Sequence, residues 1–395
     1  MASTQSARRT LTVLLSFGAF GLTNSVWQSA LPDLQNSLHL SSSKLGSVIT
    51  IGYLVAIPLM SIGGRIVDKI GANAICGIAL LFMAASLLGI VQIHTYPLLV
   101  GCSLFYSAAV GMLDIGINAA AIAREHEREA PLLPTAHGFY SLFAMVSAIL
   151  YGGLLYFGGG FHTAYIAVSS VVAVFALVLL IGRPMPESRR SATQGAHHAV
   201  GLHLFLDLAL LAVAGLVFLD LMGDATLGNW SAIYLRSISH GSAIASSLAV
   251  AVYHASMACG RFFVNHLLRT ISRRQALLIA GLLISGGMVV GIAAHSLALI
   301  IGSIFVVGLA IAVVMPIGLS IGGDLKPGSP GDVSAVLIMA AYVSNLISPL
   351  LIGALADRYG IRGALGTVVI VGVLIAICGP RVAAMASRRL SVPAD

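Results

Sequence analysis

Twelve apolar stretches, each long enough to cross a lipid bilayer as a helix, constrain this chain more than any other feature. A bilayer core of about 30 Å needs about 20 residues of helix. The chain is 58% hydrophobic and 9% charged, with a mean hydropathy of +0.98, whereas a soluble domain carries about 25% charged residues. The sequence therefore predicts a multi-span membrane protein. The predicted spans are Leu11–Leu31, Leu45–Val67, Ala74–Ile93, Leu98–Ile122, Gly138–Phe157, Ala164–Ile181, Leu204–Leu227, Ala243–Leu267, Ala276–Ala294, Leu297–Ile317, Val333–Ala356 and Ala364–Cys378.

The first stretch follows two arginines, as the apolar region of a signal peptide does. It is too long for that region and lacks a small-residue cleavage site, so we expect an uncleaved first span.

The interval 183–202 near the midpoint has no apolar run and contains three arginines and two prolines. Such a composition is typical of a solvated linker. We therefore predict an all-α membrane protein with twelve transmembrane helices in two six-helix halves. The N-terminal bundle covers residues 1–182, the cytoplasmic linker 183–202 and the C-terminal bundle 203–395.

The distribution of cations predicts the orientation. With the N-terminus in the cytoplasm, 17 of the 21 Lys and Arg residues lie on the cytoplasmic side, and only Lys44, Arg236, Arg358 and Arg362 lie outside. The positive-inside rule then places both termini inside. The net charge of +7 is spread over short loops rather than clustered on one face, so we expect no nucleic-acid partner.

Neither the cysteines nor the histidines form a metal-binding pattern. Cys76, Cys102, Cys259 and Cys378 lie in separate apolar stretches without a C-x-x-C spacing, which argues against a disulfide framework or a zinc site. The pair His197 and His198 in the linker lacks further ligands at fixed spacing. We expect no metal and no cofactor.

A loop motif recurs weakly at half the chain length. Gly64, Arg65, Asp68, Lys69 and Gly71 form a G-R-x-x-D-K-x-G pattern after the second predicted span. An echo follows at Gly260 and Arg261, with Asn265 where a carboxylate would stand, at the corresponding end of the eighth span. An internal repeat of this kind is typical of a duplicated transporter.

With these features the chain resembles the major facilitator superfamily over essentially its whole length. The loop after span two is similar to that family's G-x-x-x-D-[RK]-x-G-[RK]-[RK] signature, although Ala72 and Asn73 replace its two trailing basic residues. The stretches GMLDIGINAAAIAREHERE, HGFYSLFA, GDATLGNW and SPLLIGALADRYGIRGAL resemble a branch related to fucose-type sugar-proton symporters, which includes many bacterial inner-membrane proteins. The resemblance implies the fold more strongly than the solute.

The motif residues Gly64, Asp68, Lys69 and Gly71 are the predicted gate. The Asp68 carboxylate could accept from the free N–H groups at the start of span eleven, near Val333, and so latch the halves on the cytoplasmic side. Alternatively, it is a loop carboxylate paired with Lys69 or Arg65. We also predict Arg124 as a partner of Asp68. His137, at the cytoplasmic mouth of span five, is a candidate helix-start or gate residue.

Three acids lie deep within predicted spans, where a carboxylate costs about 2.5 kcal/mol or more and marks a functional hypothesis. Asp114 shares a helix face with Asn118, and it could either serve transport or lock the N-terminal bundle by a hydrogen bond. Asp220 and Asp224 share a face of span seven. The resemblance favours a buried acid at Asp114 and at Asp224, and Asp220 is the weaker candidate.

Two glycines, Gly223 and Gly228, bracket Asp224. Such glycines permit local unwinding where a helix lines a cavity.

Neutral polar groups complete the predicted binding site. His254, near the centre of span eight, could relay a proton or contact the solute, or could simply be hydrogen-bonded to a neighbour. Trp27 could line the cavity or anchor the helix at the interface, and for Trp230 we favour the anchor. The predicted lining residues are Asn24 and Gln28 of span one, Tyr53, Tyr140, His254, and Tyr342 and Asn345 of span eleven.

Motifs of hydrolases, nucleotide-binding loops and metalloproteases are absent from the sequence, so we expect a secondary transporter and no enzyme. We predict a monomer in the lipid bilayer that moves a small-molecule substrate by alternating access with a proton, or with sodium. Proton-antiport drug efflux is the first alternative, although Tyr151, Gly152 and Gly153 stand where such exporters carry a proline-containing element. A receptor or scaffold that does not transport is the second.

Overall fold

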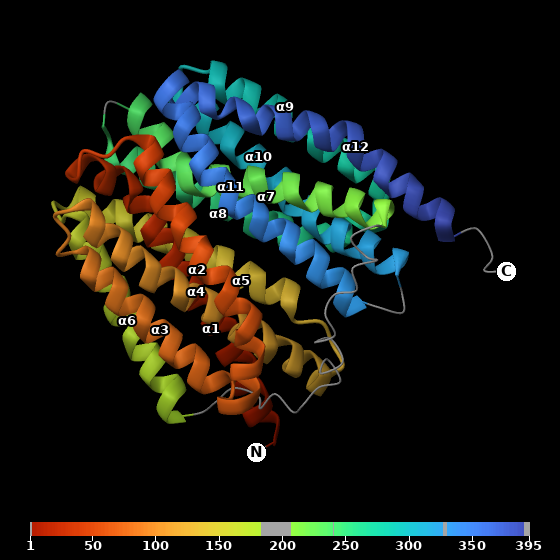
Figure 1. Cartoon of the computed structure of the whole chain (residues 1–395), viewed down its shortest axis with the longest axis horizontal. Coiled ribbons are helices and arrows are strands. Elements are labelled where there is room, and N and C mark those ends of the chain that lie inside the picture. The colour runs from red at the N-terminus through yellow and green to blue at the C-terminus, as the bar shows by residue number, and fades with distance from the viewer. Residues whose placement is uncertain (1, 183–206, 240, 327–329, 391–395) are drawn as a thin grey trace.

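A computed structural model of the chain describes residues 2–182, 207–239, 241–326 and 330–390. Those residues form twelve helices, each long and apolar enough to cross a membrane (Figure 1). The helices are α1 Ala2–Ser37, α2 Ser42–Ile70, α3 Ala72–Ile90, α4 Tyr96–Arg128, α5 Leu133–Tyr156, α6 Phe161–Gly182, α7 Leu208–Ile238, α8 Ala243–Thr270, α9 Arg273–Ala293, α10 Leu297–Leu325, α11 Pro330–Ala364 and α12 Gly366–Leu390. The predicted fold class is confirmed.

Polar caps fix where several helices begin. Ser41 accepts a hydrogen bond from the backbone N–H of Lys44 at the start of α2. Ser272 and Gln275 form a reciprocal capping box on α9. Asp207 accepts from the first turn of α7 and pairs with Lys326 at 3.1 Å. Each cap satisfies N–H groups that lack a partner inside the helix.

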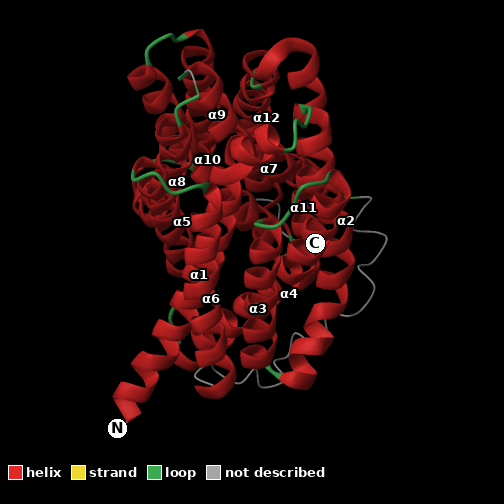
Figure 2. Ribbon diagram, turned by 90° about the vertical axis from the view of Figure 1, so that its left-hand side faces the viewer, coloured by secondary structure: helices red, strands yellow, loops and turns green. Residues whose placement is uncertain are grey.

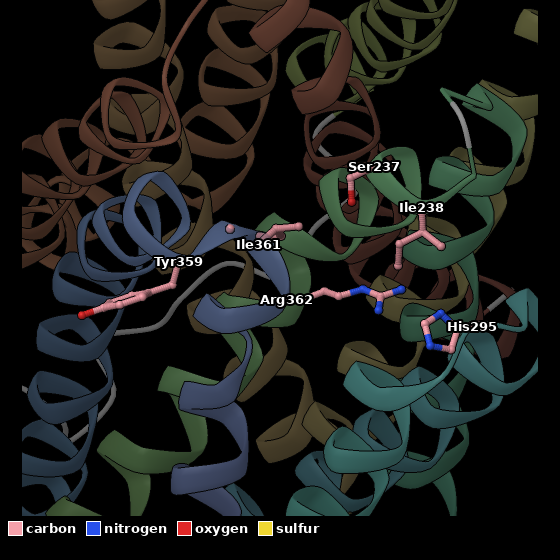
Figure 3. A pocket seen from close by; sticks show the side chains of 7 residues that line it. Ser237, Ile238, His295, Tyr359, Ile361 and Arg362 are labelled. Carbon is pink, nitrogen blue, oxygen red and sulfur yellow. The ribbon is translucent and has the colours of Figure 1, made fainter.

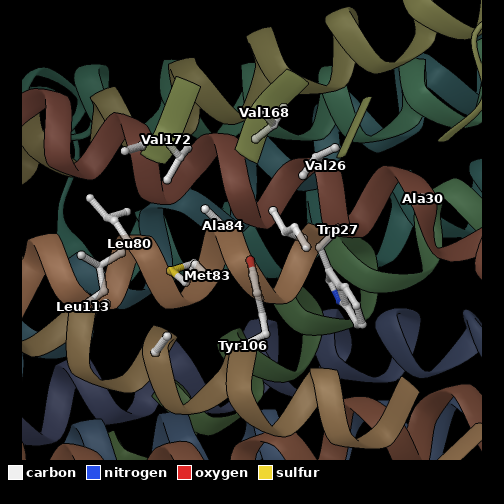
Figure 4. Close-up of a cluster of buried hydrophobic side chains, with 14 of the residues drawn as sticks. Val26, Trp27, Ala30, Leu80, Met83, Ala84, Tyr106, Leu113, Val168 and Val172 are labelled. Atoms are coloured by element: carbon white, nitrogen blue, oxygen red, sulfur yellow. The ribbon is translucent and has the colours of Figure 1, made fainter. Parts of the chain in front are cut away.

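Two apolar cores hold the helices together. In the first half, α3 packs on α4 and α6, and α1 packs on α5. Figure 4 shows part of this core, where Tyr106 of α4 lies between Trp27 of α1 and Met83 of α3. In the second half, α9 packs on α10 and α12, and α7 on α8 and α10.

The halves meet along two helix pairs, α5 with α8 and α2 with α11. The first core also takes in Trp230 and Ile233 of α7 and Ile352 of α11. One end of the second set of helices is therefore buried against the first set. In Figure 1 the two sets lie close together at the left and separate towards the right.

The two ends of the bundle are distinguished by their charged residues, and Figure 2 shows the helices running roughly from one end to the other. We call the end that carries Asp33, Arg236 and Asp357 the outer end, following the predicted topology. The end that carries Asp68 and Arg124 is the inner end.

Helix boundaries differ from the predicted spans. The helix α7 begins at Leu208 rather than Leu204 and continues to Ile238, well beyond the predicted Leu227. The helix α10 likewise continues to Leu325. An apolar run predicts only the part of a helix that lipid surrounds. Backbone hydrogen bonds extend the helix beyond that part into polar residues. The predicted linker 183–202, with His197 and His198, lies outside the described residues.

Candidate functional site

Asp114 lies on α4 and is held by polar groups from both halves. The Asn118 side-chain amide donates to Asp114 Oδ1 at 2.9 Å, which confirms that the two residues share a helix face. The Tyr342 hydroxyl of α11 donates to Asp114 Oδ2 at 3.0 Å. One carboxylate thus connects the N-terminal and C-terminal helices, and none of the Lys or Arg side chains that the structure describes pairs with it.

A second cluster surrounds Asn24 of α1. Its side-chain oxygen accepts from the Tyr106 hydroxyl at 3.0 Å, and its amide donates to the Tyr140 hydroxyl at 3.0 Å. Trp27 stacks on the Tyr106 ring, with centroids 5.7 Å apart, and is 6% exposed. Trp27 therefore belongs to the interior rather than to an interfacial belt.

Gln28 and His254 link α1 to α8. The His254 Nε2 atom lies 2.8 Å from Gln28 Oε1, which accepts, and the imidazole is buried. The His254 ring also meets the Tyr140 ring edge-on, at 6.1 Å between centroids. Next to it on α8, the Tyr253 hydroxyl donates to Asp224 Oδ1 of α7.

These clusters border one interior region. Tyr53 of α2, partly buried, lies within electrostatic range of Tyr140, Asp224 and Asp114. Asn345 of α11 is also partly buried, and none of the described residues forms a hydrogen bond with its amide. The predicted polar residues therefore gather between the halves, where hydroxyls and amides can both donate to and accept from a solute.

Asp114 and Asp224 each accept from a tyrosine and have no Lys or Arg partner among the described ion pairs. A carboxylate held in this way can take up a proton or a cation without first breaking a salt bridge. This arrangement suits a coupled transporter.

Asp220 lies one turn before Asp224 on α7, close enough to interact with it electrostatically, but it takes no part in the hydrogen-bonded clusters above. It is 3% exposed, and its Oδ1 atom has no hydrogen-bond partner among the described residues. The helix α7 is continuous from Leu208 to Ile238, so the local unwinding permitted by Gly223 and Gly228 does not occur here. Instead, Gly228 leaves room for the Gln28 amide, which lies 3.0 Å from the position that a Cβ atom would take.

The predicted gate is not engaged at the inner end. Asp68 and Lys69 are exposed, and no hydrogen bond from the described residues reaches the Asp68 carboxylate. The predicted Asp68–Arg124 pair is wrong for this conformation, because the Arg124 guanidinium is buried and binds Glu127 at 2.6 Å and Thr10 at 2.9 Å. Gly64 lies within α2, and Gly71 forms the turn into α3.

His137 lies in the second turn of α5, which begins at Leu133, so it is not the first residue of the helix. Its ring meets Phe17 edge-on at 5.1 Å. Arg261 belongs to the weak second copy of the loop motif, on α8. Its guanidinium donates to the His137 backbone oxygen at 3.3 Å and to Ser141 Oγ at 2.7 Å. Arg261, at the position of the weak repeat, thus makes a contact between α5 and α8 that joins the two halves.

The prediction that Trp230 anchors the helix at the interface is wrong. Its side chain is fully buried in the core of the first half, and its indole N–H has no partner among the described residues. In the sequence, Trp230 lies just beyond the end of a predicted span, which is the usual place of an interfacial anchor. The packing of α7 onto the other half buries its side chain. Among the described residues no group of three His, Cys, Asp or Glu side chains could hold a metal ion.

Four polar residues that matter in the structure are not among the predicted ones. Asp33 of α1 pairs with Arg236 of α7 and accepts from the Tyr151 hydroxyl of α5. Asp357 of α11 accepts two backbone N–H groups at the start of α2. All these contacts lie at the outer end and join elements far apart in sequence, so no local pattern indicates which groups meet.

A pocket of about 590 Å³ lies at the outer end of the C-terminal half, between the ends of α7 and α11 and the loop before α10. Figure 3 shows Arg362 pointing towards His295, while Tyr359 points away. None of the predicted site residues lines it. Its lining residues are Ser237, Ile238, His295, Tyr359, Gly360, Ile361 and Arg362.

Comparison with known proteins identifies relatives over the whole chain. The sequence profile of the Major Facilitator Superfamily matches residues 13–219 and 213–391. Membrane protein MosC of Rhizobium meliloti is 25% identical over 365 residues, which cover 92% of this chain and 88% of MosC. An uncharacterized MFS-type transporter of Yersinia pestis is 25% identical over 366 residues, 92% of each chain.

Solved structures of transporters share the fold. The nucleoside transporter NupG matches with a TM-score of 0.77 and 15% identity, covering 97% of this chain and 99% of NupG. A bacterial homolog of the human lysosomal transporter Spinster, inward-facing and unoccupied, matches with a TM-score of 0.78 and 14% identity over 99% of both chains. At these identities the likeness concerns the fold alone, and the resemblance to fucose-type symporters stays a prediction.

Proposed function

Because the chain belongs to the Major Facilitator Superfamily, it is a membrane transporter of small solutes, and we propose that it moves a small polar solute by alternating access with a proton as the coupling ion. The two six-helix halves rock about the interior polar region and expose it to one side at a time. We place the protein in the bacterial inner membrane, with both termini in the cytoplasm.

The two tyrosine-bound carboxylates, Asp114 in the first half and Asp224 in the second, support this proposal most directly. A hydrogen bond to an ionised carboxylate is about twice as strong as one to a neutral group. A proton on Asp114 would therefore weaken the Tyr342 bond, which joins the halves. Protonation and conformation are coupled through that contact.

The surrounding groups favour a hydroxylated solute. Asn24, Gln28 and Asn345 offer amides, and the neighbouring tyrosines offer hydroxyls. The stacked rings of Trp27 and Tyr106 provide an aromatic wall that a ring-shaped solute can contact. Such polar groups disfavour an apolar drug as the main cargo. A transporter of the same fold carries nucleosides, so nucleosides and sugars are the first solutes to test.

Gating at the inner end completes the cycle. In the outward-facing conformation, Asp68 would accept from the free N–H groups at the start of α11, near Val333. This contact would compensate the positive end of the helix dipole and hold the inner side closed. The exposed Asp68 carboxylate in the present conformation is free of bonds to the described residues, which is what an open inner side requires.

Binding can be tested before transport. The purified protein is screened by thermal shift against nucleosides and sugars at two pH values, because a ligand that binds the folded state raises its melting temperature. A hit whose shift depends on pH gives the solute for uptake measurements. If only apolar drugs stabilise the protein, the polar-solute proposal is wrong.

Coupling is tested in proteoliposomes with an imposed pH gradient. Asp114→Asn and Asp224→Asn should each abolish gradient-driven accumulation while leaving solute exchange detectable. Asp324→Asn is the matched control, because its carboxylate pairs with Arg273 within the second half at an exposed site. Unchanged accumulation in both interior variants would refute proton coupling, and accumulation driven by sodium without a pH gradient would replace the proton by sodium.

A further inference from the structure

The loop motif at the inner end has a second copy at the outer end. Residues 64–71 read G-R-I-V-D-K-I-G, and residues 353–360 read G-A-L-A-D-R-Y-G. In both copies a glycine precedes the acid by four residues, a basic residue follows it, and a second glycine comes three residues after it. The first copy ends α2 at the turn into α3, and the second lies in the last part of α11, where Gly360 interrupts the helix a few residues before α12.

Both copies adopt the same backbone turn. Gly71 has φ 85° and ψ 154°, and Gly360 has φ 72° and ψ 164°. Only glycine adopts this combination readily, because a Cβ atom would be strained there. The acid of each copy therefore lies about one helical turn before an equivalent reversal of the chain.

The acid of the outer copy binds the opposite half. Asp357 Oδ1 accepts the backbone N–H of Ser42 at 2.8 Å, and Oδ2 accepts that of Ser43 at 2.9 Å. Ser41 accepts the next N–H, from Lys44. A carboxylate at a helix N-terminus also compensates the helix dipole. The first turn of α2 is thus capped partly by its own serine and partly by α11.

The outer ends of α2 and α11 approach so closely that side chains are excluded. A Cβ atom on Gly46 would lie 2.2 Å from the Pro349 backbone oxygen. One on Gly353, the first residue of the outer copy, would lie 2.5 Å from the Ser42 backbone oxygen. Both contacts depend on the outer side being closed.

The outer copy is attached to its own half. Arg362, two residues after Gly360, donates to the Ala294 backbone oxygen at 3.4 Å, at the pocket of Figure 3. This bond fastens the turn to the loop before α10. If the second half rotates away from the first, Asp357 leaves Ser42 and Ser43.

The inner copy shows the opposite state, since Asp68 is exposed and has no hydrogen bond to the described residues. In this fold each half consists of two inverted three-helix repeats. The helices α2 and α11 hold the same place in the first and fourth repeats, with opposite directions through the membrane. Asp357 caps the first turn of α2 at the outer end. By the symmetry of the repeats, Asp68 is placed to cap the first turn of α11 at the inner end.

We propose that Asp357 is an outer latch, which caps the first turn of α2 to hold the outer side closed and must release for the solute site to open outwards. The two acids then act in turn: the Asp357 contact is formed when the outer side is closed, and the Asp68 contact is formed when the inner side is closed. The inference rests on the proposed alternating access.

The latch is tested by distances, so that no solute is needed. In a background without native cysteines, exposed positions Asn36 and Ser296 carry spin labels at the outer end of the two halves. A second pair, at exposed Arg128 and Arg274, reports the inner end. Double electron–electron resonance in nanodiscs gives the populations of short and long distances for each pair.

Asp357→Asn removes the charge and replaces one acceptor by an amide N–H₂. We expect the ratio of outer-closed to outer-open molecules to fall about fivefold, with the inner pair moving to shorter distances. Gly353→Ala should act in the same direction, because its methyl group meets the Ser42 oxygen. Asp324→Asn, whose ion pair lies within the second half, should change neither distribution.

Unchanged outer distances in Asp357→Asn and Gly353→Ala would overturn the latch. If those variants still accumulate solute, the latch alone is wrong and the proposed transport stands. If no tested solute is transported but the distances shift as described, the latch stands and the proposed solute and coupling ion are wrong.

Discussion

The Asp33–Arg236 ion pair gives the strongest single prediction about the conformational equilibrium. It joins α1 to α7 at the outer end, and the Tyr151 hydroxyl of α5 donates to the same carboxylate. Asp33→Asn removes the charge but keeps the shape of the side chain. The buried part of Arg236 then loses its counter-ion whenever the outer side is closed.

The magnitude follows from the burial of the pair. The side chains of Asp33 and Arg236 are 14% and 15% exposed. Removing one partner of a buried pair costs about 3–5 kcal/mol, whereas an exposed pair contributes about 0–1 kcal/mol. With limited solvent access, we expect a loss of about 2 kcal/mol. The loss falls on the outer-closed conformation alone, so the outward-open fraction should rise about 30-fold.

Cysteine labelling measures that fraction. Ser29 is fully buried on α1 and lies one turn before Asp33 on the same helix face. In a background without native cysteines, Ser29→Cys should react with a membrane-impermeant maleimide added outside only when the outer side opens. Its labelling rate should therefore rise about 30-fold in Asp33→Asn.

A matched control is Glu127→Gln, whose carboxylate pairs with Arg9 and Arg124 within the first half. It should leave the labelling rate within about twofold. The exchange Asp33→Arg with Arg236→Asp should restore a low rate. A rate in Asp33→Asn that stays within twofold of the parent would refute the assignment of this pair as an outer contact that opens.

Three further variants test packing and turns through thermal unfolding in detergent. Trp230→Ala should lower stability by about 3–5 kcal/mol, because the indole is fully buried; a loss below 1 kcal/mol would contradict its core position. Gly71→Ala should cost about 1–3 kcal/mol, whereas Gly101→Ala, in open helical surroundings, should not destabilise. Arg124→Gln should cost about 1–3 kcal/mol, since the buried guanidinium links α4 to Thr10 of α1 and pairs with Glu127 of its own helix; an unchanged melting temperature would argue against that link.

The span pattern and the interior acids were predictable because their signals are local. Each helix satisfies its own backbone in lipid, so an apolar run of sufficient length predicts a span without knowledge of its neighbours. The pair Asp114 and Asn118 follows from the helical repeat of the sequence and is confirmed by their hydrogen bond. Polar residues in apolar runs likewise indicate groups that face protein rather than lipid.

The partners of those groups were not predictable. Nothing in the sequence around Tyr342 indicates that its hydroxyl meets Asp114, or that Arg124 binds Thr10 instead of Asp68. Trp230 has the sequence context of an interfacial anchor, yet it is buried because the outer part of α7 packs onto the first half. These outcomes depend on how the two halves lie against each other.

The sequence by itself determined twelve membrane helices and several of the interior polar residues, such as Asp114 and Asn118, because the energetic cost of exposing polar groups to lipid acts on each segment separately. Only the tertiary structure decided which side of the protein is closed. That choice depends on contacts between helices distant in the chain, such as Asp357 with Ser42 and Asp33 with Arg236. Alternative arrangements of the same helices differ by few such contacts, so a local pattern cannot select among them.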